Sequence, residues 1–150
     1  LRQAGQLSAE EIGELDFEAM QSFWGSEVGR QIRGRGEHVQ REMPFTLRLG
    51  ADQVRELIGR KGFPESAEEE FVVVQGQIDL VVECSEELWL VDYKTDRVGP
   101  GEATARAEDY RAQLEIYARA LEGIFGKPVT RRWVHFLHPG KTVLLASRSD

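Results

Sequence analysis

The chain has 150 residues, of which 41% are hydrophobic and 30% are charged, and its formal net charge is −7. These values predict a single soluble domain with no membrane span and no signal peptide. The single cysteine, Cys84, excludes a disulfide framework and a multi-cysteine metal site, and it favours a reducing, cytoplasmic setting. The acidic balance argues against a protein that coats nucleic acid, because such proteins bind by neutralising phosphates.

The first third of the chain predicts two helices followed by a bent strand. Residues 8–33 carry apolar side chains at helical spacing, and Gly25 divides them into two helices. Residues 37–50 predict a strand bent near Pro44, and a short helix follows within 51–62. A basic cluster lies between the helices and the strand and is formed by Arg30, Arg33, Arg35, His38 and Arg41. A solvated face is the simplest interpretation of this cluster, and contact with a phosphate backbone is the alternative.

The remainder of the chain predicts four strands and one long helix. Strands are expected at 71–84, 87–95, 129–137 and 141–147, and a helix of about twenty residues at 103–124. Gly126 and Pro128 mark the end of this helix. The order of elements predicts an α/β domain without a second-domain boundary. The sequence contains no G-x-x-x-x-G-K-[ST] phosphate loop, so it predicts no nucleotide-driven motor within these residues.

Two aspartates stand inside apolar strands. Alternation places the even positions of 72–82 on an apolar face and Asp79 on the other face with Gln75 and Gln77. In the next strand Leu88, Leu90, Asp92 and Lys94 share a face, with Asp92 and Lys94 about 7 Å apart. A tight turn with Ser85 and Glu86 at its tip would set Asp79 opposite Asp92 and Gln77 opposite Lys94. A slip of one residue would undo this register.

Two opposed carboxylates repel each other unless a proton or a cation lies between them. Mg²⁺ resolves the repulsion, since it takes one or two carboxylates together with water and a phosphate. Lys94 would then orient the attacking water or stabilise charge in the transition state. The alternative is a surface aspartate in an ordinary ion pair with Lys94, which is favoured for Asp92 and Lys94 alone. Adding Asp79 within so apolar a run favours a metal site for phosphodiester hydrolysis.

The predicted helix adds two polar residues to this picture. Its apolar stripe is formed by Tyr110, Leu114, Tyr117, Leu121 and Ile124. Gln113 lies four residues before Tyr117 and therefore shares a face with it. Taken alone, Tyr117 would be a core residue with a bonded hydroxyl, and Gln113 a solvent-facing one.

Four motifs, in this order and at these spacings, resemble those of the RecB-like branch of the PD-(D/E)XK nucleases. They are E-x-P-F at 42–45, G-x-I-D at 76–79, V-D-Y-K-T-D at 91–96 and Q-x-x-x-Y at 113–117. More narrowly, nearly the whole chain looks like the C-terminal nuclease domain of the AddA (RexA) component of bacterial helicase–nuclease complexes. The resemblance implies a restriction-endonuclease-like fold, with a central mixed β-sheet flanked by helices.

The resemblance also implies roles for individual residues. Asp79 and Asp92 would bind Mg²⁺ or Mn²⁺, and Lys94 would be the catalytic lysine. Gln113 and Tyr117 match an accessory motif that orders the active site, and Glu42 matches an acidic position of the first strand. By alternation, Tyr93 and Thr95 face away from the carboxylates and are packing residues, and Asp96 is a weak further candidate.

The function implied is that of a metal-dependent DNA exonuclease domain in double-strand-break repair and recombination. Its partners would be DNA, the helicase domains of the parent chain and a second nuclease subunit. The family's upstream R-G-T-x-x-H histidine has no match, because His38, His135 and His138 stand in other contexts. Residues 1–150 are therefore predicted to be a single nuclease domain that lacks its histidine-bearing helix and cuts poorly in isolation.

Two other functions stay open. One is a non-catalytic module of the same fold that holds a complex together or guides DNA, which the missing histidine favours. The other is a free-standing nuclease of the same superfamily that acts on RNA or branched DNA.

Overall fold

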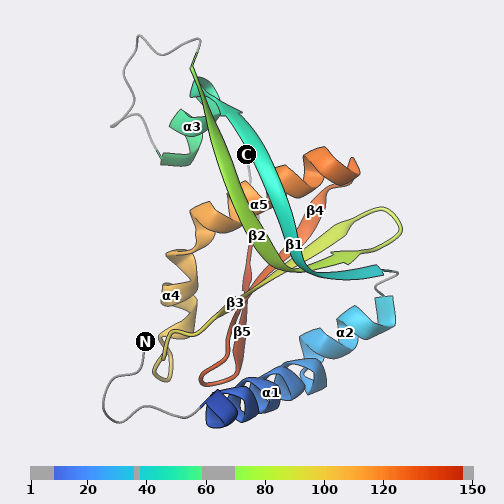
Figure 1. Cartoon of the computed structure of the whole chain (residues 1–150), viewed down its shortest axis with the longest axis vertical. Coiled ribbons are helices and arrows are strands. Elements are labelled where there is room, and N and C mark those ends of the chain that lie inside the picture. Colours follow the sequence, from blue (N-terminus) through green and yellow to red (C-terminus); the bar gives the residue numbers. More distant parts are fainter. Residues whose placement is uncertain (1–8, 36–37, 59–69, 147–150) are drawn as a thin grey trace.

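A five-stranded mixed sheet forms the centre of the domain in a computed structural model that describes residues 9–35, 38–58 and 70–146 (Figure 1). The strand order is β1-β2-β3-β4-β5, and all neighbours are antiparallel except the parallel pair β3 and β4. The strands are β1 (His38–Gly50), β2 (Phe71–Glu83), β3 (Leu88–Lys94), β4 (Val129–Phe136) and β5 (Lys141–Leu145). The predicted strands and the predicted α/β fold class are confirmed.

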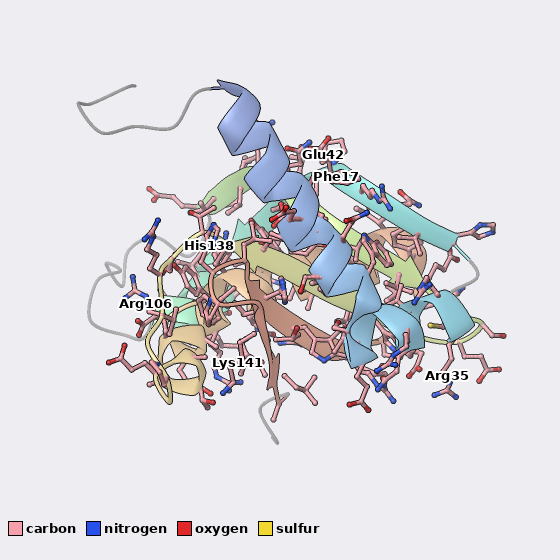
Figure 2. All side chains as sticks on the ribbon, turned by 90° about the horizontal axis from the view of Figure 1, so that it is seen from below. Phe17, Arg35, Glu42, Arg106, His138 and Lys141 are labelled. Atoms are coloured by element: carbon pink, nitrogen blue, oxygen red, sulfur yellow. The ribbon has the colours of Figure 1, made fainter. Side chains whose placement is uncertain are left out.

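The described residues form five helices. They are α1 (Ala9–Gly25), α2 (Glu27–Arg35), α3 (Ala51–Ile58), α4 (Ala103–Glu108) and α5 (Arg111–Phe125). Helices α1 and α2 lie across one face, as Figure 2 shows for α1, and α4 and α5 cover the other. Over the described residues, no helix is long and apolar enough to cross a membrane. The part of the predicted 51–62 helix beyond residue 58 lies outside the described residues.

Strand β3 is buried on both faces, which explains its nearly continuous apolar run. Leu88 and Leu90 belong to the hydrophobic core under α4 and α5, together with Leu114, Leu121 and Phe136. Trp89 and Val91 belong to a second core under α1 and α2, together with Phe23, Ile32 and Trp133. The polar residues at the end of β3 are therefore placed by the strand's strict alternation between two cores.

The hairpin between β2 and β3 has the predicted register. Leu80 pairs with Val91 and Glu83 with Leu88, and the Cys84 N–H donates to the Glu87 carbonyl at 2.9 Å. Ser85 and Glu86 thus form the tip of the turn. The ladder reaches Leu80, so its continuation sets Asp79 opposite Asp92.

The predicted single apolar face of β2 is wrong beyond residue 78. Ile78 packs in the core under α4 and α5, whereas Leu80 packs in the core under α1 and α2. The reason lies in β1, where Glu42 has a φ of 51°, in the left-handed region. The pairs Arg41–Leu80 and Met43–Ile78 flank this residue, so both strands exchange faces at Glu42 and Asp79. The bend falls two residues before Pro44.

The predicted helix at 103–124 is two helices. It breaks at Asp109 and Tyr110, where Tyr110 leaves the helical conformation with a ψ of 1°. The Tyr110 hydroxyl donates to Asp96 at 2.6 Å, and this tertiary contact fixes the break without any glycine or proline. Helix α5 ends at Gly126, whose φ of 66° is the left-handed cap that the sequence predicts.

The corner between α1 and α2 depends on Gly29. A Cβ at this position would meet backbone atoms of Phe23 and Trp24, the Trp24 Cα at 2.6 Å. We expect Gly29→Ala to lower the free energy of unfolding by about 1–3 kcal/mol, as overpacking does. Gly34→Ala in the same helix meets nothing within 4 Å and should be neutral or stabilising by up to about 1 kcal/mol. Urea unfolding followed by tryptophan fluorescence compares them, and equal values would contradict the close contact.

His135 gives the fold a defined pH dependence. It is 1% exposed on β4, packs on the Phe23 ring, and burial lowers the pKa of its imidazole to about 4. The unfolded chain therefore binds the proton more readily, so stability is lost as the pH falls from 6.5 toward 4. In His135→Gln this slope should be smaller, whereas the exposed His38→Gln should keep it. Unfolding free energies measured across this range check the difference.

Candidate active site

The two predicted acids meet at the end of the β2–β3 ladder. Asp92 is 3% exposed and lies on the α5 side of β3, the side of Leu88 and Leu90. Asp79 is half-buried, and its Oδ2 accepts a hydrogen bond from the Tyr93 backbone N–H at 2.7 Å. The Asp79 side chain thus satisfies a backbone donor of β3 and is held beside Asp92.

The negative charge of Asp92 is disfavoured by its surroundings. Burial raises the pKa of its carboxyl to about 6 against the opposing effect of Lys94, and the charge of Asp79 raises it further. Its Oδ2 lies 2.8 Å from the Lys94 Nζ. This buried oxygen nevertheless has no hydrogen-bond partner within the described chain, because the ammonium approaches outside hydrogen-bonding geometry. The carboxylate pair is therefore incompletely compensated by the protein's own groups.

Lys94 is fixed from three directions. Besides Asp92, its Nζ donates to the Gln113 Oε1 at 2.7 Å and lies 4.2 Å from the centroid of the Tyr110 ring. An ammonium carries three N–H donors, and Gln113 takes one of them, so donor capacity remains for a further partner. The side chain is 16% exposed, which places this donor at the boundary between the core and solvent.

Gln113 and Tyr117 extend the network along α5. The Gln113 Nε2 donates to the Tyr117 hydroxyl at 2.7 Å, and this fixes which end of the amide faces Lys94. Burial raises the pKa of the Tyr117 hydroxyl, and the charges of Asp92 and Asp79 add to this effect. The structure thus brings both residues to the carboxylates, and neither is the isolated core or surface residue that each would be alone.

The glycine of the G-x-I-D motif supports this network through its missing side chain. A Cβ on Gly76 would come within 2.9 Å of the Phe45 ring, which lies across from it in β1. The Phe45 ring in turn packs edge-on against Tyr117, with 5.3 Å between the ring centroids. The motifs at 42–45, 76–79 and 113–117 are therefore in physical contact.

The sequence did not predict that Tyr110, held by Asp96, supports Lys94. Asp96 accepts hydrogen bonds from the Tyr110 hydroxyl and from the Arg106 Nε at 2.8 Å, and both partners lower the pKa of its carboxyl. These bonds hold the Tyr110 ring against the ammonium. Asp96 is thus engaged away from the carboxylate pair. Alternation along β3 placed Asp96 on the same face as Asp92 and Lys94. The helix break before α5, which the sequence did not predict, is what brings Tyr110 to Asp96.

The remaining candidates lie apart from this cluster. Glu42 stands opposite Asp79 in the β1–β2 register, and its side chain is exposed (Figure 2). Its backbone carbonyl accepts a hydrogen bond from Gln77. Tyr93 and His135 pack against Phe23 on the opposite face of the sheet, as expected of packing residues. Within the described chain, no three acidic, histidine or cysteine side chains gather as metal ligands.

The two aspartates nevertheless fit a divalent cation. They present paired carboxylates, one of them with a buried oxygen that lacks a hydrogen bond. Hard cations such as Mg²⁺ prefer carboxylate oxygens and commonly take one or two from the protein. A cation between them would offset both the burial of Asp92 and the charge of Asp79, which together raise the pKa of the Asp92 carboxyl.

Comparison with known proteins identifies the relatives of this sequence. The sequence is similar to an ATP-dependent helicase/nuclease subunit from Desulforudis audaxviator (strain MP104C), with 38% identity over 93% of this chain. The protein of the same name from Thermoanaerobacter sp. (strain X514) is 34% identical over 89% of the chain, and that from Moorella thermoacetica is 35% identical over 89%. The chain spans about a tenth of the length of these relatives.

These matches confirm the resemblance to AddA-type proteins. The profile of the PD-(D/E)XK nuclease superfamily matches residues 3–147, a range that includes all four motifs and the whole sheet. Because this match covers nearly the whole chain, the chain belongs to the PD-(D/E)XK nuclease superfamily.

Proposed function

We propose that this domain is a divalent-metal-dependent nuclease that hydrolyses phosphodiester bonds of DNA. The observation that carries the proposal is the pairing of half-buried Asp79 with buried Asp92 beside a lysine held by Gln113 and Tyr110. A structural ion pair would require only Asp92 and Lys94. The second carboxylate and the two groups that position the ammonium are explained by catalysis.

Asp79 and Asp92 would hold Mg²⁺ or Mn²⁺. When bound, such a cation acidifies water and stabilises charge on phosphate oxygens. The Tyr93 N–H takes one acceptor position of Asp79 Oδ2, which leaves the other positions of this carboxylate for a ligand. With two protein carboxylates, the remaining coordination positions would be filled by water and by phosphate oxygens.

Lys94 would act on the scissile phosphate or on the attacking water. An N–H donor that Gln113 does not take is available for one of these oxygens, and the positive charge is well placed to stabilise negative charge that develops there. Gln113 and Tyr110 keep the ammonium in position before substrate binds, so little reorganisation is required during the reaction.

The names of the relatives suggest the setting. In a combined helicase and nuclease, the motor elsewhere in the protein would deliver a DNA strand end to this domain for exonucleolytic cutting. A second nuclease subunit would cut the other strand, in double-strand-break repair and recombination. DNA affinity supplied partly by the motor is compatible with the domain's net charge of −7.

Replacing either Asp92 or Lys94 should stop cleavage of one DNA strand. We expect Asp92→Asn and Lys94→Gln in the complete protein to lower the cleavage rate by about 100-fold or more, because each removes a charge at the reacting phosphate. The exposed Asp109→Asn and Lys141→Gln serve as matched controls. Cleavage is followed on duplexes labelled separately on each strand, so that a second nuclease is not mistaken for this one. Unchanged cutting of both strands by both variants would exclude the assignment.

A non-catalytic scaffold predicts a different response to metal. Titration calorimetry with Mn²⁺ should detect a site in the wild-type protein that is lost in Asp79→Asn and in Asp92→Asn but kept in Asp109→Asn. The physical reason is that each amide removes one anionic oxygen ligand from the pair. Identical heats for all four proteins would favour the scaffold.

A further inference from the structure

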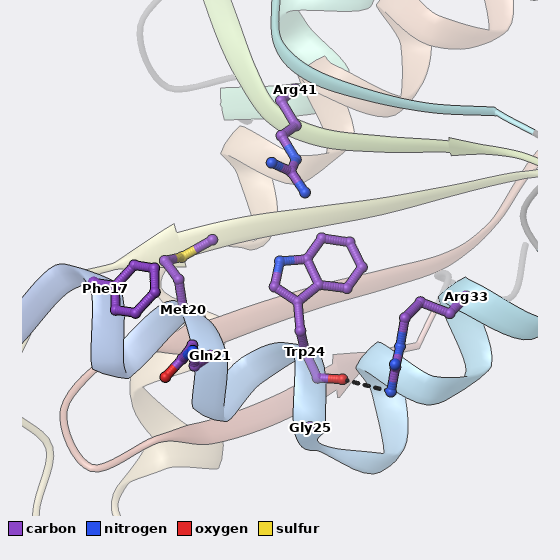
Figure 3. Close-up of a pocket in the computed structure, with 7 residues that line it drawn as sticks. All are labelled: Phe17, Met20, Gln21, Trp24, Gly25, Arg33 and Arg41. Atoms are coloured by element: carbon purple, nitrogen blue, oxygen red, sulfur yellow. Dashed lines mark hydrogen bonds between the residues drawn. The ribbon is translucent and has the colours of Figure 1, made fainter.

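A groove opens on the face of the domain opposite the carboxylates. Its volume is about 630 Å³, and it lies between α1, Arg33 in the last turn of α2 and the side chain of Arg41 on β1 (Figure 3). The groove-lining residues that matter here are Phe17, Met20, Trp24, Arg33 and Arg41. They combine two aromatic rings with two guanidinium groups.

The aromatic part of the groove is exposed and partly rigid. Phe17 is 64% exposed, so its ring is available to a partner. Trp24 is half-buried, and its indole packs edge-on against the buried Phe23 ring with 5.4 Å between the centroids. One edge of the indole is thereby fixed while the ring borders the groove (Figure 3). Such a ring is a ready platform for a flat partner.

The two arginines give the groove a positive charge. The Arg41 guanidinium lies 5.3 Å from the centroid of the Trp24 ring, and Arg33 donates to the Trp24 carbonyl at 3.1 Å. Neither forms an ion pair with any carboxylate in the part of the chain whose side chains are described. Guanidinium groups bind phosphate through paired N–H donors, so an anion that also carries a flat ring complements this groove.

The groove is connected to the carboxylate pair through two short paths. Arg41 is adjacent to Glu42, which stands opposite Asp79 at the point where β1 and β2 exchange faces. Phe23, against which Trp24 packs, also contacts the ring of Tyr93, whose N–H binds Asp79. The groove and the carboxylates lie on opposite faces of the sheet but are thus linked through Arg41 and through Phe23.

We propose that this groove binds single-stranded DNA, with a base stacked on the Trp24 indole and the adjoining phosphate bound by Arg41 and Arg33. Stacking on an aromatic side chain together with arginine contacts to the backbone is the general mode of single-strand binding. A duplex keeps its bases paired and stacked, so it cannot use the indole. The inference deepens the proposed nuclease function and rests on it, because the groove would hold the strand that the carboxylates cut.

The test is photocross-linking of the complete protein to a single-stranded oligonucleotide that contains 5-iodouracil, in EDTA so that nothing is cleaved. We expect a cross-link within the peptide that contains Phe17 and Trp24, located by mass spectrometry. Arg41→Gln and Trp24→Leu should lower the yield at subsaturating DNA by about fivefold or more, the lower range for loss of one stacking contact. Trp24→Phe, which keeps a ring, should retain most of it.

Arg30→Gln is the matched control, because Arg30 is exposed on the same helix as Arg33 but does not line the groove. Equal yields from Arg41→Gln and Arg30→Gln would overturn the proposal. So would cross-links that map only to other segments, or an equal loss of cross-link with duplex and single-stranded competitors. The result is independent of the nuclease assignment: Asp92→Asn should cross-link normally, whereas failure of the nuclease proposal appears as cleavage by that variant.

Discussion

The burial of Asp92 is the constraint on which the arrangement of the site depends. A carboxylate that is 3% exposed requires compensation, and the nearest compensating charge is the Lys94 ammonium, which must itself be held in place. Gln113 holds it from α5, and Tyr110 holds it from the break before α5. The elements on this face of the sheet are therefore positioned around a single buried charge.

The need to place two carboxylates together also explains why the site lies where the pairing of β2 with β3 ends. Between Leu80 and Glu83, β2 gives its backbone groups to β3 in regular pairs. At Asp79 a side chain replaces the backbone as the acceptor, because the Asp79 carboxylate accepts the Tyr93 N–H of β3. The strand pair thus ends where its hydrogen bonds pass from backbone to side chain, and this change sets two acids side by side.

Sequence reasoning went furthest where local periodicity decides the structure. The hairpin register, the shared face of Asp92 and Lys94, the pairing of Gln113 with Tyr117 and the cap at Gly126 all follow from spacing within one or two elements. The reversal at Glu42 could not be found this way, because a non-glycine residue with positive φ is uncommon and leaves no local signal. The role of Tyr110 was hidden for a related reason. Its position depends on Asp96, fourteen residues away, and on a helix break without a breaking residue.

The exchange of faces in β1 and β2 has a consequence for how the domain unfolds. The register between β1 and β2 is the same on both sides of Glu42. Strand β2 nevertheless contributes Ile78 to the core under α4 and α5, and Leu80 to the core under α1 and α2. Neither helical layer can detach without exposing part of a strand that the other layer also needs. The two cores are thereby joined into one cooperative unit, although the sheet separates them in space.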